Sequence, residues 1–345
     1  MITLKEIAEK CAVSITTVSN ILNGKSNVSE STKDRVLKVI KETGYRPNYM
    51  ARGLRASKTN SIGIIIDDLI EFSSPEIIDG IMSYCDEHKY KAILENLRFY
   101  SLWGAKWYHN KGYETAVQQA IDEFSSIKVD GIIYVAAHAR NITCIPENLD
   151  LPFVISYAFT DHPNISTVEF DDIDAAYNLT KHLIKNGHKK IAVIAGTEKN
   201  IHTMRRIQGC KKALEENNLK FIEENLIYAQ WDCDSGYTAA KALYESKKDF
   251  SAIFCHNDLM AAGVYEYLEE KGLVPGKDVA IAGFDNRTVS QFLKPDLTTV
   301  EIPLKEIGKK SAELILNQIN NPDDFKAQEC FVECKLIERN SVSKI

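Results

Sequence analysis

Apolar residues recur every three to four positions near the start of the chain, and this spacing predicts three short helices. The first helix begins with a capping box, in which Thr3 is the N-cap and Glu6 lies three residues further along. The second helix spans Ile15 to Leu22, and the third begins after Ser29 and ends at Gly44. Two short helices joined by a tight turn and followed by a supporting helix are typical of a helix-turn-helix domain.

From residue 62 onward, short apolar runs alternate with segments of helical periodicity. This alternation predicts parallel sheets that are covered by helices on both faces. Because this part of the chain is large for one sheet, we expect a two-lobed α/β body that binds a ligand between its lobes, at the carboxyl ends of the strands. The predicted strands are 62–67, 92–96, 131–135, 152–156, 190–195, 252–255 and 279–284, and the predicted helices are 75–87, 113–125, 175–186, 204–217, 235–245 and 259–271.

Charge is distributed unevenly along the chain, whose net charge is −6. Residues 1–60 contain eleven Lys and Arg against five Asp and Glu, whereas the remaining residues contain 31 against 43. A basic head on an acidic body indicates that the head binds a polyanion. The second predicted helix also offers hydroxyl and amide groups that suit phosphate oxygens and base edges, namely Ser14, Thr16, Thr17, Ser19 and Asn20. We therefore interpret the head as a module that binds double-stranded DNA.

Residues 45–60 connect the head to the body and have two interpretations. Pro47 suits the first turn of a short helix over 48–55, but a helix of this length is not stable alone in water. The segment is therefore either a flexible linker or a hinge that becomes helical on DNA. In the second case, Leu54 enters the minor groove as an apolar wedge between Arg52 and Arg55.

Several stretches of the head resemble the LacI/GalR family of repressors. They are Thr3-Leu4-Lys5-Glu6-Ile7-Ala8, Val13-Ser14, Thr17-Val18-Ser19, Asn23-Gly24, Gly44-Tyr45-Arg46-Pro47-Asn48 and Ala51-Arg52-Gly53-Leu54. By this resemblance, Ile15, Thr16 and Asn20 occupy the main base-reading positions, and Leu54 matches a leucine that the family inserts at the operator centre. Position 20 is usually Arg or His in the family, whereas Asn pairs best with adenine. The full set of expected DNA contacts is Ser14, Ile15, Thr16, Thr17, Ser19, Asn20, Asn27, Tyr45, Asn48, Arg52 and Leu54.

The body resembles the same family and, through it, the periplasmic sugar-binding fold. The matching stretches are 129–133, 187–191, Arg206-x-x-Gly209, Asn257-Asp258-Leu259-Met260-Ala261, Gly283-Phe284-Asp285-Asn286, 297–300 and 336–341. The resemblance implies a headpiece over 1–46, a hinge over 47–60, and an effector-binding and dimerisation domain over 61–345. It also implies a homodimer that binds a near-palindromic operator, with a dimer surface near 75–87 and 259–271.

Residues at the predicted strand ends are candidates for binding a small-molecule effector. A polyhydroxylated ring can be bound by a set of groups that hydrogen-bond its hydroxyls and pack on its face, namely one guanidinium, one amide, carboxylates and a flat aromatic ring. These residues are Arg206, Trp231, Asn257, Asp258 and Asp285, with Phe72, Pro75 and Tyr157 as further candidates. By the resemblance, all of the first five except Asp258 match effector-contacting positions. Taken alone, Asp258 would equally serve to cap the next helix, and Trp231 would equally serve as a core residue.

Residues 99–113 contain six aromatic residues, where the family usually has a short acidic loop. This segment has three alternative interpretations. It is a lid or stacking wall for the effector, a surface that binds a partner, or a loop that packs over the first lobe. The loop at 156–158 also lacks the acid or Arg that is common in the wider fold. The effector is therefore a carbohydrate, or alternatively a purine or a phosphocarrier protein.

Other classes of protein have little support in the sequence. We find no motif for a hydrolase, a metal site or a dinucleotide cofactor, and the eight cysteines contain no Cys-x-x-Cys pair. No apolar run is long enough to span a membrane, and no signal peptide or leucine-heptad tail is recognisable. We therefore expect a cytoplasmic, effector-controlled transcription regulator without a cofactor. A cytoplasmic small-molecule-binding protein or enzyme remains the alternative of another class.

Overall fold

The computed structural model describes residues 2–22, 28–45, 58–104, 107–110, 112–246 and 248–345. The chain forms two compact units, a head over 1–59 and a body over 60–345. Most of the expected hinge and four of the expected DNA contacts, Asn27, Asn48, Arg52 and Leu54, lie outside the described residues.

The head contains the three predicted helices, α1 (Leu4–Lys10), α2 (Ile15–Leu22) and α3 (Glu30–Thr43). The predicted capping box is present, because the Thr3 hydroxyl accepts from the Glu6 N–H and the Glu6 carboxylate accepts from the Thr3 N–H at 2.7 Å. The third helix ends at Gly44, whose φ of 63° is left-handed and favours glycine. A small core forms where the helices meet, from Ile7, Ala8, Cys11, Val18, Ile21 and Val36.

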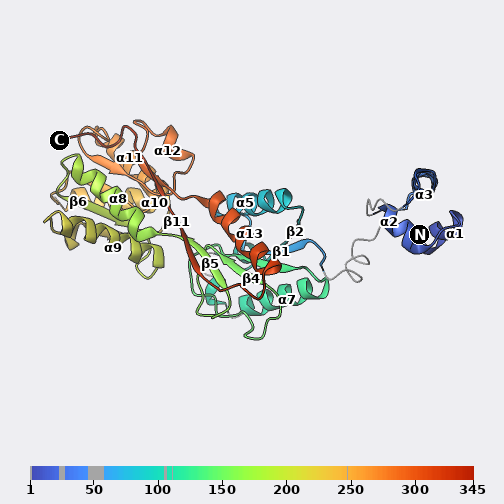
Figure 1. Cartoon of the computed structure of the whole chain (residues 1–345). Helices are drawn as coiled ribbons and strands as arrows, with labels where there is room; N and C mark the ends of the chain where they lie inside the picture. Colours follow the sequence, from blue (N-terminus) through green and yellow to red (C-terminus); the bar gives the residue numbers. More distant parts are fainter. Residues whose placement is uncertain (1, 23–27, 46–57, 105–106, 111, 247) are drawn as a thin grey trace. The chain divides into compact units, whose positions relative to one another are not determined.

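The first lobe of the body is built on a parallel six-stranded sheet in the order β11-β5-β4-β3-β1-β2 (Figure 1). Alternate residues of β1 face opposite cores: Ile64 packs with the helices α5 and α13, and Ile65 packs with α7. The strands are β1 (Ser61–Ile66), β2 (Lys91–Asn96), β3 (Gly131–Val135), β4 (Phe153–Ser156), β5 (Ser166–Phe170) and β11 (Glu329–Val332). The helices are α5 (Ser74–Glu87), α6 (Phe99–Trp103), α7 (Gly112–Ser126) and α13 (Leu304–Asn320), with a 3-10 turn at Trp107–His109.

The second lobe has a parallel four-stranded sheet in the order β7-β6-β8-β9. Its strands are β6 (Ile191–Ala195), β7 (Leu226–Tyr228), β8 (Ala252–Cys255) and β9 (Ala280–Ala282). Its helices are α8 (Asp172–Lys185), α9 (Ile201–Glu216), α10 (Cys233–Glu245), α11 (Asp258–Glu270) and α12 (Val289–Phe292), with a 3-10 turn at Glu223–Asn225. The predicted two-lobed α/β body with parallel sheets is therefore confirmed.

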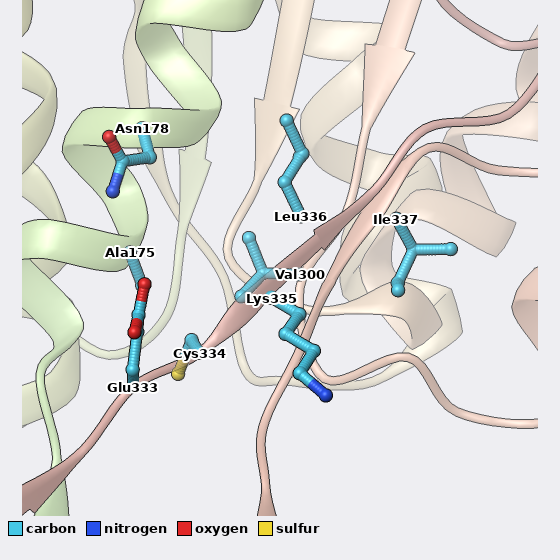
Figure 2. Close-up of a pocket in the computed structure, with 8 residues that line it drawn as sticks. All are labelled: Ala175, Asn178, Val300, Glu333, Cys334, Lys335, Leu336 and Ile337. Carbon is cyan, nitrogen blue, oxygen red and sulfur yellow. The ribbon is translucent and has the colours of Figure 1, made fainter.

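In the described part of the chain, three segments connect the lobes: β5 to α8, β10 (Thr299–Glu301) to α13, and β11 to β12 (Lys335–Ile337). The strands β10 and β12 pair antiparallel, which ties two of these connections together. A cavity of about 390 Å³ lies beside them, and Figure 2 shows Glu333 and Cys334 on its wall next to Ala175 of α8. The other lining residues are Asn178, Val300, Lys335, Leu336 and Ile337.

Candidate DNA-binding surface and effector site

The second helix of the head, α2, has a buried face and an exposed face. Val18 and Ile21 are buried in the head core, whereas Ile15 is 39% exposed, Thr16 is exposed and Asn20 is half-buried. Residues four positions apart, such as Thr16 and Asn20, share a side of a helix, and with Ile15 they lie away from the buried Val18 and Ile21. This is the surface on which the sequence places the base-reading positions.

The other candidate contacts of the head have local roles. The Ser14 hydroxyl accepts from the Thr17 N–H at 3.0 Å and pairs with the Thr17 hydroxyl at 2.8 Å, so these two residues cap α2. Ser19 is half-buried on α2. Tyr45 packs against the head core and donates its N–H to the Ile40 carbonyl at 3.2 Å.

In the body, Arg206 is the centre of a buried ionic cluster. Its Nε donates to Oδ1 of Asp172 at 2.7 Å, and its Nη1 lies 3.8 Å from Oδ1 of Asp285. The guanidinium also donates to the His256 carbonyl and lies 3.6 Å from the centre of the Phe284 ring. Only 2% of Arg206 is exposed, so these contacts hold a charge that would otherwise be costly to bury.

The cluster lies where the two lobes meet. His202 of α9 places its Nδ1 2.7 Å from Oδ2 of Asp172, and its ring stacks on Phe170 of the first lobe with centroids 5.4 Å apart. Tyr157, also from the first lobe, lies 5.7 Å from the same imidazole. The Arg287 guanidinium lies 4.0 Å from the Phe72 ring, which adds a second contact between the lobes.

The residues that follow β8 and β7 are held by hydrogen bonds within the second lobe. Asn257, rather than Asp258, is the N-cap of α11: its side-chain oxygen accepts from the Met260 N–H at 2.8 Å. Its amide donates to the Trp231 carbonyl at 2.9 Å, and Trp231 is half-buried. Asp258 accepts from the Thr299 hydroxyl at 2.6 Å.

Burial and neighbouring charges shift the pKa values of the acids in this region. Burial, together with the charge of Asp285, raises the pKa of Asp258 to about 8. Burial and the nearby Asp68 raise the pKa of Glu71 to about 7. Burial opposes ionisation of Asp172 as well, but the charges of His202 and Arg206 outweigh it and lower the pKa of Asp172. Asp172, which Arg206 and His202 contact, is therefore held in its charged form, whereas burial favours the protonated forms of Asp258 and Glu71.

The aromatic segment packs into the first lobe. Phe99 and Trp107 are fully buried with ring centroids 4.7 Å apart, and the Arg140 guanidinium lies 4.6 Å from the Trp107 ring centre. Arg140 is in turn paired with Asp67, which directly follows β1, at 2.8 Å. These contacts favour the packed-loop interpretation for this part of the segment. Leu102, 62% exposed, lies on its outer side.

Two family descriptions cover most of the chain. Residues 3–48 match the bacterial regulatory proteins of the lacI family, and residues 99–340 match the periplasmic binding proteins and sugar binding domain of the LacI family. The chain belongs to the LacI family. It is therefore a DNA-binding transcription regulator, as its sequence predicts, and its relatives are regulators rather than enzymes.

Individual LacI-family relatives align along nearly the whole chain. The HTH-type transcriptional repressor PurR of Vibrio atlanticus is 30% identical over 347 residues, covering 100% of both chains. Catabolite control protein A of Priestia megaterium is 32% identical over 325 residues, covering 92% of this chain and 93% of that protein. The lac repressor dimer bound to operator and the anti-inducer ONPF shares the fold, with a TM-score of 0.82, 23% identity and 99% coverage of both chains.

The structure brings together most of the effector candidates of this LacI-family chain. Arg206, Asp285 and Tyr157 lie at the junction of the lobes, and Phe72 joins them through Arg287. Pro75 is exposed in the first turn of α5. Sequence reasoning did not find Asp172, Phe170, His202 or Arg287. His202 lies four residues before Arg206, and this helical spacing was the available signal.

Among the described residues, each helix is too short or too polar to traverse a lipid bilayer. The same residues contain no group of three or more His, Cys, Asp or Glu side chains that could hold a metal ion.

Proposed function

We propose that this regulator is a homodimeric repressor whose operator affinity is controlled by an uncharged carbohydrate bound between the lobes. The observation that carries the proposal is charge compensation: three guanidiniums at the junction are already paired with carboxylates at 2.7–3.0 Å. The pairs are Arg205–Glu169, Arg206–Asp172 and Arg287–Asp285. A phosphorylated effector needs an uncommitted cation, whereas hydroxyl groups can donate to these carboxylates.

Similarity supports the same class of effector. A transcriptional regulator CelR–cellobiose complex matches this chain with a TM-score of 0.66 and 25% identity, covering 99% of this chain and 100% of that one. The aromatic rings at the junction, Phe170, Tyr157 and Trp231, can pack on the apolar face of a sugar ring. The same rings would stack on a nucleobase, so a purine is the second candidate.

The proposed mechanism is a population shift. An effector that contacts both lobes stabilises one angle between them and changes the operator affinity of the paired heads. In the operator complex, two heads enter adjacent major grooves of a near-palindrome, and the segment 47–60 orders at its centre with Leu54 as the wedge. The proposed dimer surface includes α5 and α11, and the proposed location is the cytoplasm, where the operator lies.

Titration calorimetry with the full-length protein tests the class of effector. Uncharged mono- and disaccharides are compared with their phosphates and with nucleobases. We expect an uncharged sugar to bind and its phosphate to bind more weakly. We expect Trp231→Ala to lower the affinity for the sugar. Tyr228→Ala is the control, because it removes an exposed aromatic side chain on β7, and we expect it to leave this affinity unchanged. Tighter binding of a phosphate or a nucleobase than of every uncharged sugar would reject the proposal.

A further inference from the structure

The helix α2 presents an uncharged surface to solvent. Its residues Ile15–Leu22 include no acidic and no basic side chain. Among the described residues of the head, the cations lie elsewhere: Lys5 and Lys10 on α1, Lys33, Arg35, Lys38 and Lys41 on α3, and Lys58 outside the helices. Attraction to phosphates and discrimination between bases therefore come from different elements of the head.

The polar side chains at the surface of α2 differ in whether they already form hydrogen bonds within the head. The hydroxyls of Ser14 and Thr17 are paired with each other in the cap. In the described part of the chain, the side chains of Thr16 and Asn20 form no hydrogen bond. Thr16 and Asn20 are four residues apart, so they lie on the same side of the helix. The exposed Ile15 adjoins Thr16 in the sequence, and all three lie away from the buried Val18 and Ile21.

Base edges in the major groove require different partners. Guanine presents two acceptors, which Arg or Lys contacts, whereas adenine presents one acceptor and one donor, which a carboxamide matches at both atoms. The thymine methyl group is contacted by apolar side chains. The surface of α2 offers the carboxamide of Asn20, the aliphatic side chain of Ile15 and the hydroxyl of Thr16, and α2 offers no cation for guanine.

We propose that α2 reads A·T base pairs, with the Asn20 carboxamide on an adenine edge and Ile15 against a thymine methyl group. This proposal rests on the DNA-binding function of the head and on the general docking of a second helix-turn-helix helix into the major groove. Thr16, which can donate or accept, supports either base of such a pair.

Selection of duplexes from a random library with the full-length protein tests this inference. We expect A·T pairs at the half-site positions that become degenerate when Asn20 is changed to Ala. The substitution Asn20→Ala is expected to reduce discrimination at one base pair by about 5- to 150-fold. Asn20→Arg is expected to shift the preference at that pair to guanine. Asn20 is half-buried and outside the head core, so circular dichroism should show both variants folded.

A matched control separates base reading from general affinity. Lys38→Ala on α3 is expected to weaken binding to all sequences by a similar factor and to leave the selected bases unchanged. Enrichment of G·C at the positions that respond to Asn20 would overturn the inference while leaving DNA binding intact. Enrichment of no sequence at all would instead overturn the DNA-binding function on which it rests.

Discussion

At the scale of single residues, the body depends on a few buried charges that neutralise one another. Arg206 is 2% exposed and Asp172 is 1% exposed, so neither charge is solvated by water. Such a pair contributes little net stability when intact, because desolvation offsets the attraction. Removing one partner is costly, since the other charge stays buried.

The variant Arg206→Ala is therefore expected to lower the free energy of unfolding by about 3–5 kcal/mol, because it leaves the buried carboxylate of Asp172 without the guanidinium that pairs with it. Urea denaturation of the full-length protein measures this loss. Lys241→Ala is the control, because Lys241 and Glu245 form an exposed pair at 3.9 Å and such pairs contribute about 0–1 kcal/mol. Equal effects of the two substitutions would contradict the buried-cluster interpretation.

Asp258 predicts a dependence of stability on pH. Burial raises its pKa to about 8 in the folded protein, above the value near 4 of an unfolded chain, so the folded state binds the extra proton between these values. Its contribution to stability is complete below the unfolded pKa and is lost as the pH rises through the folded pKa. We expect Asp258→Asn to remove part of the decline in stability between about pH 4 and pH 8. Parallel pH profiles of variant and parent would rule out this role.

At the scale of elements, neighbouring helices of the body touch through glycines. A Cβ atom on Gly308 of α13 would collide with the Ile77 carbonyl of α5, and one on Gly80 of α5 would collide with the Lys305 carbonyl of α13. The same close approach joins α10 to α11 at Gly236. Backbone-to-backbone packing of this kind fixes the spacing of the helices that cover the sheets.

The substitution Gly308→Ala is expected to separate α13 from α5 and to destabilise the body by about 1–3 kcal/mol, as overpacking usually does. Thermal unfolding monitored by circular dichroism detects the change. Lys309→Ala, at the next position on the same helix, changes a half-buried side chain that forms an ion pair with Glu306 and is the comparison. A Gly308 variant as stable as the Lys309 variant would show that the helices can separate at no cost.

At the scale of the whole molecule, the chain is divided into two compact units, and we propose that the head recognises DNA and the body recognises the effector. The head has its own core around Ile7 and Val36, and the body has its own cores in each lobe. Each unit therefore has the buried apolar contacts needed to fold independently.

Removal of residues 1–58 is therefore expected to abolish operator binding while the body keeps its affinity for the effector. Gel-shift titration measures the first property and calorimetry the second. Retention of operator affinity by the shortened chain would refute the proposal that the head alone binds DNA and the body alone binds the effector. Loss of effector binding with an unchanged thermal transition would show that the head contributes to the effector site.

Local patterns in the sequence determined the helices of the head and most strands and helices of the body, because periodicity and capping are set by neighbouring residues. The sequence patterns predict no element over residues 166–170 or 304–320, which form the strand β5 and the helix α13. A short strand such as β11 is defined by its pairing with β5, far away in the sequence.

The junction between the lobes was decided by the tertiary structure alone. Asp172 meets His202 and Arg206, which lie 30 and 34 positions later, only after α8 and α9 pack together. The cap of α11 shows the same limit: Asn257 and Asp258 are both suitable N-caps by type, and their contacts with Met260 and Thr299 assign the cap to Asn257. The sequence determines which polar and charged side chains are available. Long-range packing determines which of them come into contact, because the distances between residues far apart in the sequence are set only when the chain is folded.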